Sequence, residues 1–160
     1  MKLFLDTSAV IKRYVAEPGS DVVEMVYRSA DAGHVQLVYS LWTLGECLGV
    51  LDRLDRQGRL RTGGLSKGRR ALLGESARLA RLGVLTIAPL GAKLLRNAWN
   101  LLLRHHIYQA DAVQVATGLA RKVDILLTAD RQVARAAAAE GLRVLDPERQ
   151  SGEIAKLLAA

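Results

Sequence analysis

The sequence contains almost no cysteine. Cys47 is the only one among 160 residues, so no internal disulfide bond and no cysteine-rich zinc site can form. It lies in an apolar stretch, where a small buried hydrophobic residue is expected. Disulfide-stabilised domains and zinc-ribbon-like domains are therefore excluded.

Long hydrophobic runs and aromatic clusters are also missing. Residues 3–5 form an apolar run too short for a signal peptide, and no later run approaches the ~20 residues of a membrane-spanning helix. We expect a soluble cytoplasmic protein with no membrane partner. The two tryptophans, four tyrosines and one phenylalanine are scattered, which gives no base-stacking motif. Trp42 and Trp99 occupy apolar helical positions and are expected in the core.

The composition that remains is that of an ordinary globular protein, with 50% apolar and 24% charged residues. We expect one domain spanning residues 1–160. Short apolar segments alternate with amphipathic ones, and no hairpin turns separate them. This order predicts a three-layer α/β/α sandwich around a parallel sheet of four to five strands. Strands are expected at 2–5, 35–39, 84–88, 124–128 and 142–145, and helices at 20–30, 40–57, 66–82, 92–104, 109–121, 131–140 and from 151.

The first strand is expected to lead into a short helix. This helix would begin near Ala9 with the hydroxyl of Thr7 or Ser8 as its cap, and end at Pro18.

The net charge of +7 is concentrated in one segment. Residues 52–81 carry nine basic and three acidic residues, a surplus of 9 − 3 = +6, whereas the rest of the chain has a surplus of one. Such a surplus suits RNA phosphates, although a pair of solvated helix faces would explain it equally well. The candidate RNA-binding residues are Arg53, Arg56, Arg59, Arg61, Lys67, Arg69 and Arg70.

Four of the 16 acidic residues stand alone in apolar surroundings. Lone carboxylates are costly to desolvate unless they are paired, hydrogen-bonded or bound to metal. Each has a simple structural explanation by itself: a helix cap, the complement of a helix dipole or a buried ion pair. The four are Asp6, Glu46, Asp111 and Asp130.

The predicted fold places these acids close together, because sites in open parallel sheets form outside the carboxyl ends of the strands. Asp6 ends the first strand and Asp130 follows the fourth. Asp111 opens the helix that feeds the fourth strand, and Glu46 lies two turns inside the helix after the second. Four clustered carboxylates require cations, and all-oxygen ligation favours Mg²⁺ or Mn²⁺.

At these residues the chain resembles the PIN-domain family, in particular the VapC-type toxins of toxin–antitoxin pairs. The resemblance covers nearly the whole chain. It consists of residues 5–9 (LDTSA), the lone Glu46, residues 108–112 (YQADA) and residues 127–130 (LTAD), in that order.

The resemblance implies a Mg²⁺- or Mn²⁺-dependent endoribonuclease that hydrolyses phosphodiester bonds in single-stranded or structured RNA, as the toxin of a VapBC-type pair. The four acids match the family's catalytic, metal-binding quartet. Asp6 and Asp111 are expected to be the central ligands, while Glu46 and Asp130 act through water or orient the nucleophile. Homodimers and a small inhibitory antitoxin are usual in this branch. The hydroxyls expected to support the acids are those of Ser8 and Thr128.

Other protein classes fit the sequence less well. A receiver domain needs an acceptor aspartate after its third strand and a lysine after its fifth, where this chain has Ala-Pro-Leu and Leu-Asp-Pro. A haloacid-dehalogenase-like phosphatase needs a second acid where Ser8 stands. An RNA-processing nuclease and a non-catalytic PIN domain that binds RNA or protein remain as alternatives.

His105 and His106 face different directions on a helix, so they are expected to mark a helix junction rather than a metal site.

Overall fold

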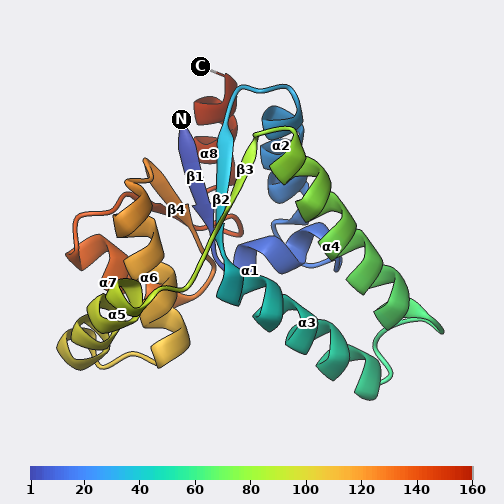
Figure 1. Ribbon diagram of the computed structural model, residues 1–160. Helices are drawn as coiled ribbons and strands as arrows, with labels where there is room; N and C mark the ends of the chain where they lie inside the picture. The colour runs from blue at the N-terminus through green and yellow to red at the C-terminus, as the bar shows by residue number, and fades with distance from the viewer. Residues whose placement is uncertain (160) are drawn as a thin grey trace.

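Figure 1 shows the computed structural model, which describes residues 1–159. Its centre is a five-stranded sheet in which every neighbouring pair is parallel. This confirms the predicted α/β class. The strand order is β3-β2-β1-β4-β5, and the strands are β1 (Lys2–Leu5), β2 (Gln36–Ser40), β3 (Leu85–Ala88), β4 (Ile125–Leu127) and β5 (Val144–Leu145).

Helices cover both faces of this sheet because the side chains that alternate between the faces along the central strands are apolar on both. Phe4 and Leu126 pack with the helices of one layer, whereas Leu3 and Ile125 pack with those of the other. The first layer contains α5 (Ala92–His105), α6 (Gln109–Arg121) and α7 (Arg131–Ala139). The second contains α1 (Thr7–Val10), the 3-10 helix Ile11–Arg13, α2 (Ser20–Asp31), α3 (Leu41–Arg56), α4 (Gly64–Arg81) and α8 (Ser151–Ala159).

Most predicted elements appear within a few residues of their expected bounds, but the turn after β1 was predicted wrongly. The helix begins at Thr7, and its cap is the Asp6 carboxylate, which accepts from the Ala9 amide at 2.9 Å. The hydroxyls proposed as caps make other hydrogen bonds: Thr7 donates to Glu46 and Ser8 donates to Asp6. The helix also ends at Val10, well before Pro18.

The expected burial of both tryptophans was wrong as well. Trp42 is 41% exposed and Trp99 is 50% exposed. Each lies next to a residue that does enter the core, Thr43 and Ala98 respectively, and therefore points away from it. Cys47 is buried as expected.

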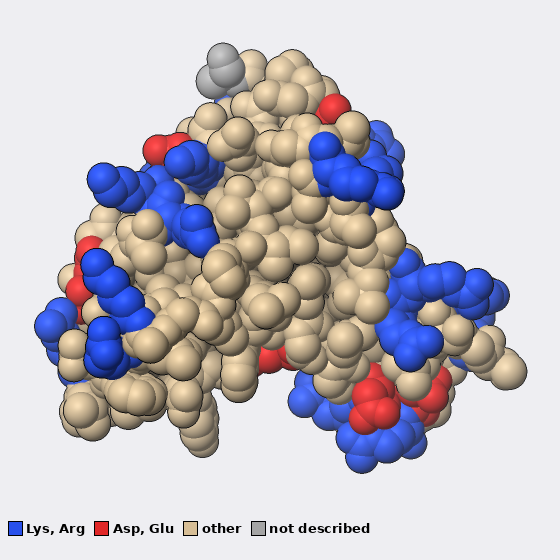
Figure 2. Space-filling model, viewed as in Figure 1, with Lys and Arg blue, Asp and Glu red and all other residues tan. Residues whose placement is uncertain are grey.

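Helices α3 and α4 form an arm that projects from the sheet (Figure 1). Basic side chains gather over this arm, and others lie on the opposite flank of the same view (Figure 2). None of the helices in residues 1–159 is both long and apolar enough to cross a membrane.

Candidate functional site

The pairing of β1 with β4 determines where the site lies. Leu5 is aligned with Leu127, and the backbone amide of Asp6 donates to the carbonyl of Leu127 at 3.2 Å. Because the two strands are parallel neighbours, the residues that follow them leave the sheet at the same edge. Asp6 and Asp130 are therefore brought to one place.

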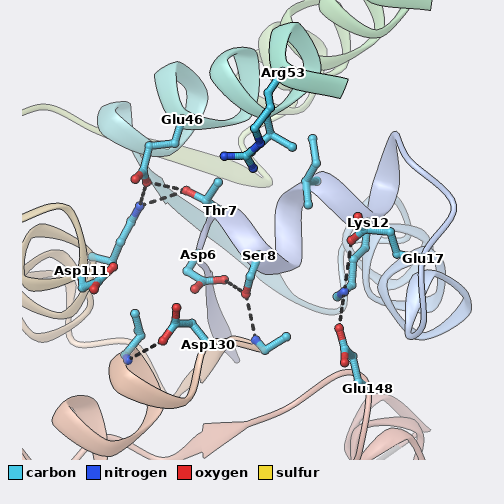
Figure 3. A pocket seen from close by; sticks show the side chains of 15 residues that line it. Asp6, Thr7, Ser8, Lys12, Glu17, Glu46, Arg53, Asp111, Asp130 and Glu148 are labelled. Atoms are coloured by element: carbon cyan, nitrogen blue, oxygen red, sulfur yellow. Dashed lines mark hydrogen bonds and ion pairs between the residues drawn. The ribbon is translucent and has the colours of Figure 1, made fainter. Parts of the chain in front are cut away.

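A cavity of about 400 Å³ opens at this edge of the sheet. All four acids predicted from the sequence line it, and Figure 3 shows Asp6 in the middle with Glu46 and Asp111 to one side. The other polar and charged residues in the wall are Thr7, Ser8, Lys12, Glu17, Arg53, Gln114 and Glu148.

Asp6 is 3% exposed, and its carboxylate is held by hydrogen bonds from two strand ends. Oδ1 accepts from the Ser8 hydroxyl at 2.7 Å and from the Ala9 amide, while Oδ2 accepts from the Thr128 hydroxyl at 2.6 Å. The two hydroxyls named from the sequence thus both contact Asp6. Together these bonds fix the orientation of a buried acid.

Asp130 is also a helix cap. Its Oδ1 accepts from the amides of Gln132 at 2.7 Å and Val133 at 3.1 Å, at the start of α7. Its own amide donates to the Thr128 hydroxyl at 2.9 Å, and that hydroxyl in turn donates to Asp6. Thr128 therefore connects the two acids.

Glu46 is held by two donors, and neither contact was predicted from the sequence: Thr7 was expected to cap a helix, and Gln114 was not singled out. Its Oε2 accepts from the Thr7 hydroxyl at 2.5 Å and from the Gln114 amide nitrogen at 2.7 Å. Gln114 is 2% exposed, and its Oε1 accepts from Thr43 at 2.9 Å. The one available signal was that Gln114 interrupts an apolar run of α6.

Lys12 is the second residue that sequence reasoning missed. It is 4% exposed, and its ammonium pairs with Glu148 at 2.6 Å and with Glu17 at 3.4 Å on the far side of the cavity from Glu46 (Figure 3). The segment after Lys12 packs closely on the loop that carries Glu148. A Cβ added to Gly19 would lie 2.8 Å from the carbonyl oxygen of Pro147.

Two of the acids have pKa values far above the ordinary range. Burial raises the pKa of Asp6 to about 6, against the lowering effect of its hydrogen bonds and with a further rise from the Asp130 charge. Burial also raises the pKa of Asp111 to about 6, and the charges of Asp130 and Glu46 add to it. The carboxylates therefore repel one another across the cavity.

This donor set fits Mg²⁺ or Mn²⁺, since the wall offers carboxylate and hydroxyl oxygens and the mutual repulsion would be relieved by a cation. Within residues 1–159, however, no three acidic, histidine or cysteine side chains are placed to hold one ion together. Mg²⁺ keeps several of its waters and needs only one or two carboxylates directly. The arrangement thus suits an ion bound partly through water.

Of the seven candidate RNA-binding residues, only Arg53 lines the cavity. The others are exposed along the arm, where Arg56 pairs with Asp52 at 2.9 Å and Arg70 donates to Ser66 at 3.3 Å. The histidine pair does mark a helix junction. His106 ends α5 in a left-handed conformation, and His105 contacts Glu140 at 2.7 Å.

The raised pKa values predict a pH dependence of stability. Between pH 3.8 and about 6 the folded chain keeps protons on Asp6 and Asp111 that the unfolded chain has released. The metal-free protein should therefore lose stability as pH rises through this window. Urea unfolding in chelator measures this, and Asp111→Asn should flatten the profile. Parallel profiles for the two proteins would contradict the assignment to Asp111.

A sequence profile of the PIN domain matches residues 3–139, whereas a search of curated proteins finds no match. Solved structures share the fold. VapC20 of Mycobacterium tuberculosis, described as a toxin that cleaves the sarcin-ricin loop, is 20% identical with a TM-score of 0.60, over 88% of this chain and 95% of that one.

Two further solved structures share the fold. FitAcB from Neisseria gonorrhoeae is 19% identical with a TM-score of 0.64, over 92% of this chain and 99% of that one. VapBC2 from Rickettsia felis, bound to a DNA fragment from its promoter, is 15% identical with a TM-score of 0.59, over 91% and 98%. The profile spans most of the sequence and includes the strands and helices that surround the acidic cavity. The chain belongs to the PIN domain family.

Proposed function

We propose that the chain is a metal-dependent endoribonuclease that hydrolyses phosphodiester bonds in RNA, and that it is the toxin of a VapBC-type pair. The observation that carries this proposal is the cavity lined by Asp6, Glu46, Asp111 and Asp130 in a chain of the PIN family. The interacting charges of these acids support a cation-binding role.

Mg²⁺ or Mn²⁺ is the proposed cofactor, with Asp6 and Asp111 as its direct ligands. When bound, such an ion supplies a water of lowered pKa and stabilises negative charge on the scissile phosphate. The chain's own task is orientation. Ser8 and Thr128 hold the carboxylate of Asp6. In this proposal Asp130 and Glu46 orient water through the carboxylate oxygens that do not accept the hydrogen bonds to Oδ1 and Oε2.

The first test removes one ligand charge at a time. Asp6→Asn and Asp111→Asn should each lower RNA cleavage by more than about two orders of magnitude, since even groups that only support ligands cost about 10–100-fold when they are removed. EDTA should abolish cleavage by the wild type. A labelled RNA incubated with Mn²⁺ provides the measurement.

Circular dichroism is the necessary control, because Asp6 is also a helix cap. Asparagine is itself a favourable cap, so the fold should persist in Asp6→Asn. Cleavage at the wild-type rate by a folded Asp6→Asn protein in chelator would rule out metal-dependent hydrolysis.

The toxin assignment leads to a second test. Solved structures of the same fold include a toxin and a complex bound to promoter DNA, which supports a small antitoxin as the partner. Expression of the chain alone should arrest growth, whereas Asp111→Asn should not, and co-expression of a short neighbouring reading frame should restore growth. Normal growth with abundant wild-type protein that cleaves RNA in vitro would favour an RNA-processing nuclease instead.

The basic residues provide a third test, because the structure separates them into two groups. Arg53 lines the cavity, whereas Arg69 and Arg70 lie exposed on α4. If the arm holds RNA phosphates, reversing Arg69 and Arg70 to glutamate should weaken binding at every sequence. The salt slope should also become shallower, by about 0.7–0.9 unit for each phosphate that the variant no longer neutralises. The measurement is a filter-binding series in increasing salt.

Arg53→Gln is the matched comparison for this series. It should lower cleavage of saturating RNA as well, because Arg53 reaches the cavity, whereas the arm variant should leave that rate nearly unchanged. An unchanged salt slope in the arm variant would show that RNA does not bind there and would favour a solvated face or a protein contact.

The homodimer stays a prediction. Trp99 and Leu103 are 50% and 69% exposed and lie one turn apart on α5, so they form an apolar strip that a second copy could cover. Light scattering of the purified chain measures its mass in solution.

A further inference from the structure

We propose that Gln114 is a positioning residue, whose buried carboxamide holds Glu46 so that one carboxylate oxygen remains for the ligand of the cavity. The inference rests on the proposed nuclease function and adds a residue to it. Gln114 lines the same cavity as the four acids and is 2% exposed.

The orientation of this amide is set by its partners. Glu46 Oε2 lies 2.7 Å from one end of the amide, and an ionised carboxylate can only accept hydrogen bonds. That end must therefore be the NH₂ group. The opposite end, Oε1, accepts from the Thr43 hydroxyl at 2.9 Å. A flipped amide would place two acceptors against each other in a buried site, which is unfavourable.

The two oxygens of Glu46 are consequently unequal. Gln114 and Thr7 both donate to Oε2. In residues 1–159, Oε1 receives no hydrogen bond from a side chain, so it is the oxygen available to water or to an ion. A glutamate has three side-chain torsions and would explore several rotamers on α3. The pair of donors selects one of them.

The same amide joins the segments that carry the other acids. Gln114 lies one turn after Asp111 on α6, and Thr43 lies one turn before Glu46 on α3, so each pair shares a helix face. A longer contact of 3.3 Å links the Gln114 amide nitrogen to Thr7, the residue after Asp6. Gln114 thus relates Glu46 to both Asp6 and Asp111.

The test compares Gln114→Met with Thr43→Val. Methionine keeps the length of the side chain but loses both hydrogen bonds, whereas valine at position 43 removes only the bond on the side away from Glu46. Gln114→Met should lower kcat by about 10–100-fold and leave the KM for RNA within about threefold. Thr43→Val should retain most of the activity even if both variants lose similar stability.

A Mn²⁺ titration of the folded proteins without RNA gives a readout that is independent of cleavage. Gln114→Met should weaken Mn²⁺ binding by about tenfold, and Thr43→Val should not. In a Glu46→Gln background, Gln114→Met should have no further effect on kcat. Should Gln114→Met not fold, Gln114→Asn, which keeps the amide but withdraws it by one methylene, replaces it.

The outcomes separate this inference from the proposed function. A wild type that neither cleaves RNA nor binds Mn²⁺ would overturn both. A wild type that does so while Gln114→Met retains normal kcat and Mn²⁺ affinity would overturn the positioning role alone. Equal losses of kcat in Gln114→Met and Thr43→Val, in proportion to their losses of stability, would also overturn it. The amide would then contribute only to packing.

Discussion

The site depends on the parallel pairing of β1 with β4. Their alignment sets Asp6 beside the end of β4, and a single hydroxyl, that of Thr128, then bonds both Asp6 and the amide of Asp130. Burial at this junction gives Asp6 its raised pKa. Glu46 and Asp111 lie on helices α3 and α6, which pack against opposite faces of the sheet. A change of register between these strands would separate the carboxylates.

The sequence alone could locate Asp6 and Asp130, because polar residues that follow apolar strands of a parallel sheet must gather at one edge. Glu46 and Asp111 were found as lone charges on apolar helices. Gln114 and Lys12 were missed for a physical reason. Their importance comes from partners 68 and 136 residues away. The interruption of an apolar run marks Gln114 as unusual, but it does not indicate which distant residue Gln114 contacts.

The structural and chemical explanations of the acids are not alternatives. Asp6 and Asp130 both cap helices, as the simple structural explanation of each residue required, and both also line the cavity. The backbone amides that make them caps hold their carboxylates still, at positive helix ends that favour negative charge. The prediction for the tryptophans failed for a different reason. Helix periodicity places a residue on one face of a helix, but it does not show whether another element packs on that face.

The match to the PIN family ends at residue 139, yet the cavity does not. Glu148 lies beyond the matched stretch, forms part of the cavity wall and binds the buried ammonium of Lys12, while Pro147 packs against Gly19. A fragment that ends at residue 139 would keep all four acids but lose β5, α8 and the part of the cavity wall that Glu148 forms. Any shortened or chimeric form of this chain must therefore retain the loop after β5, because this loop forms part of the cavity wall.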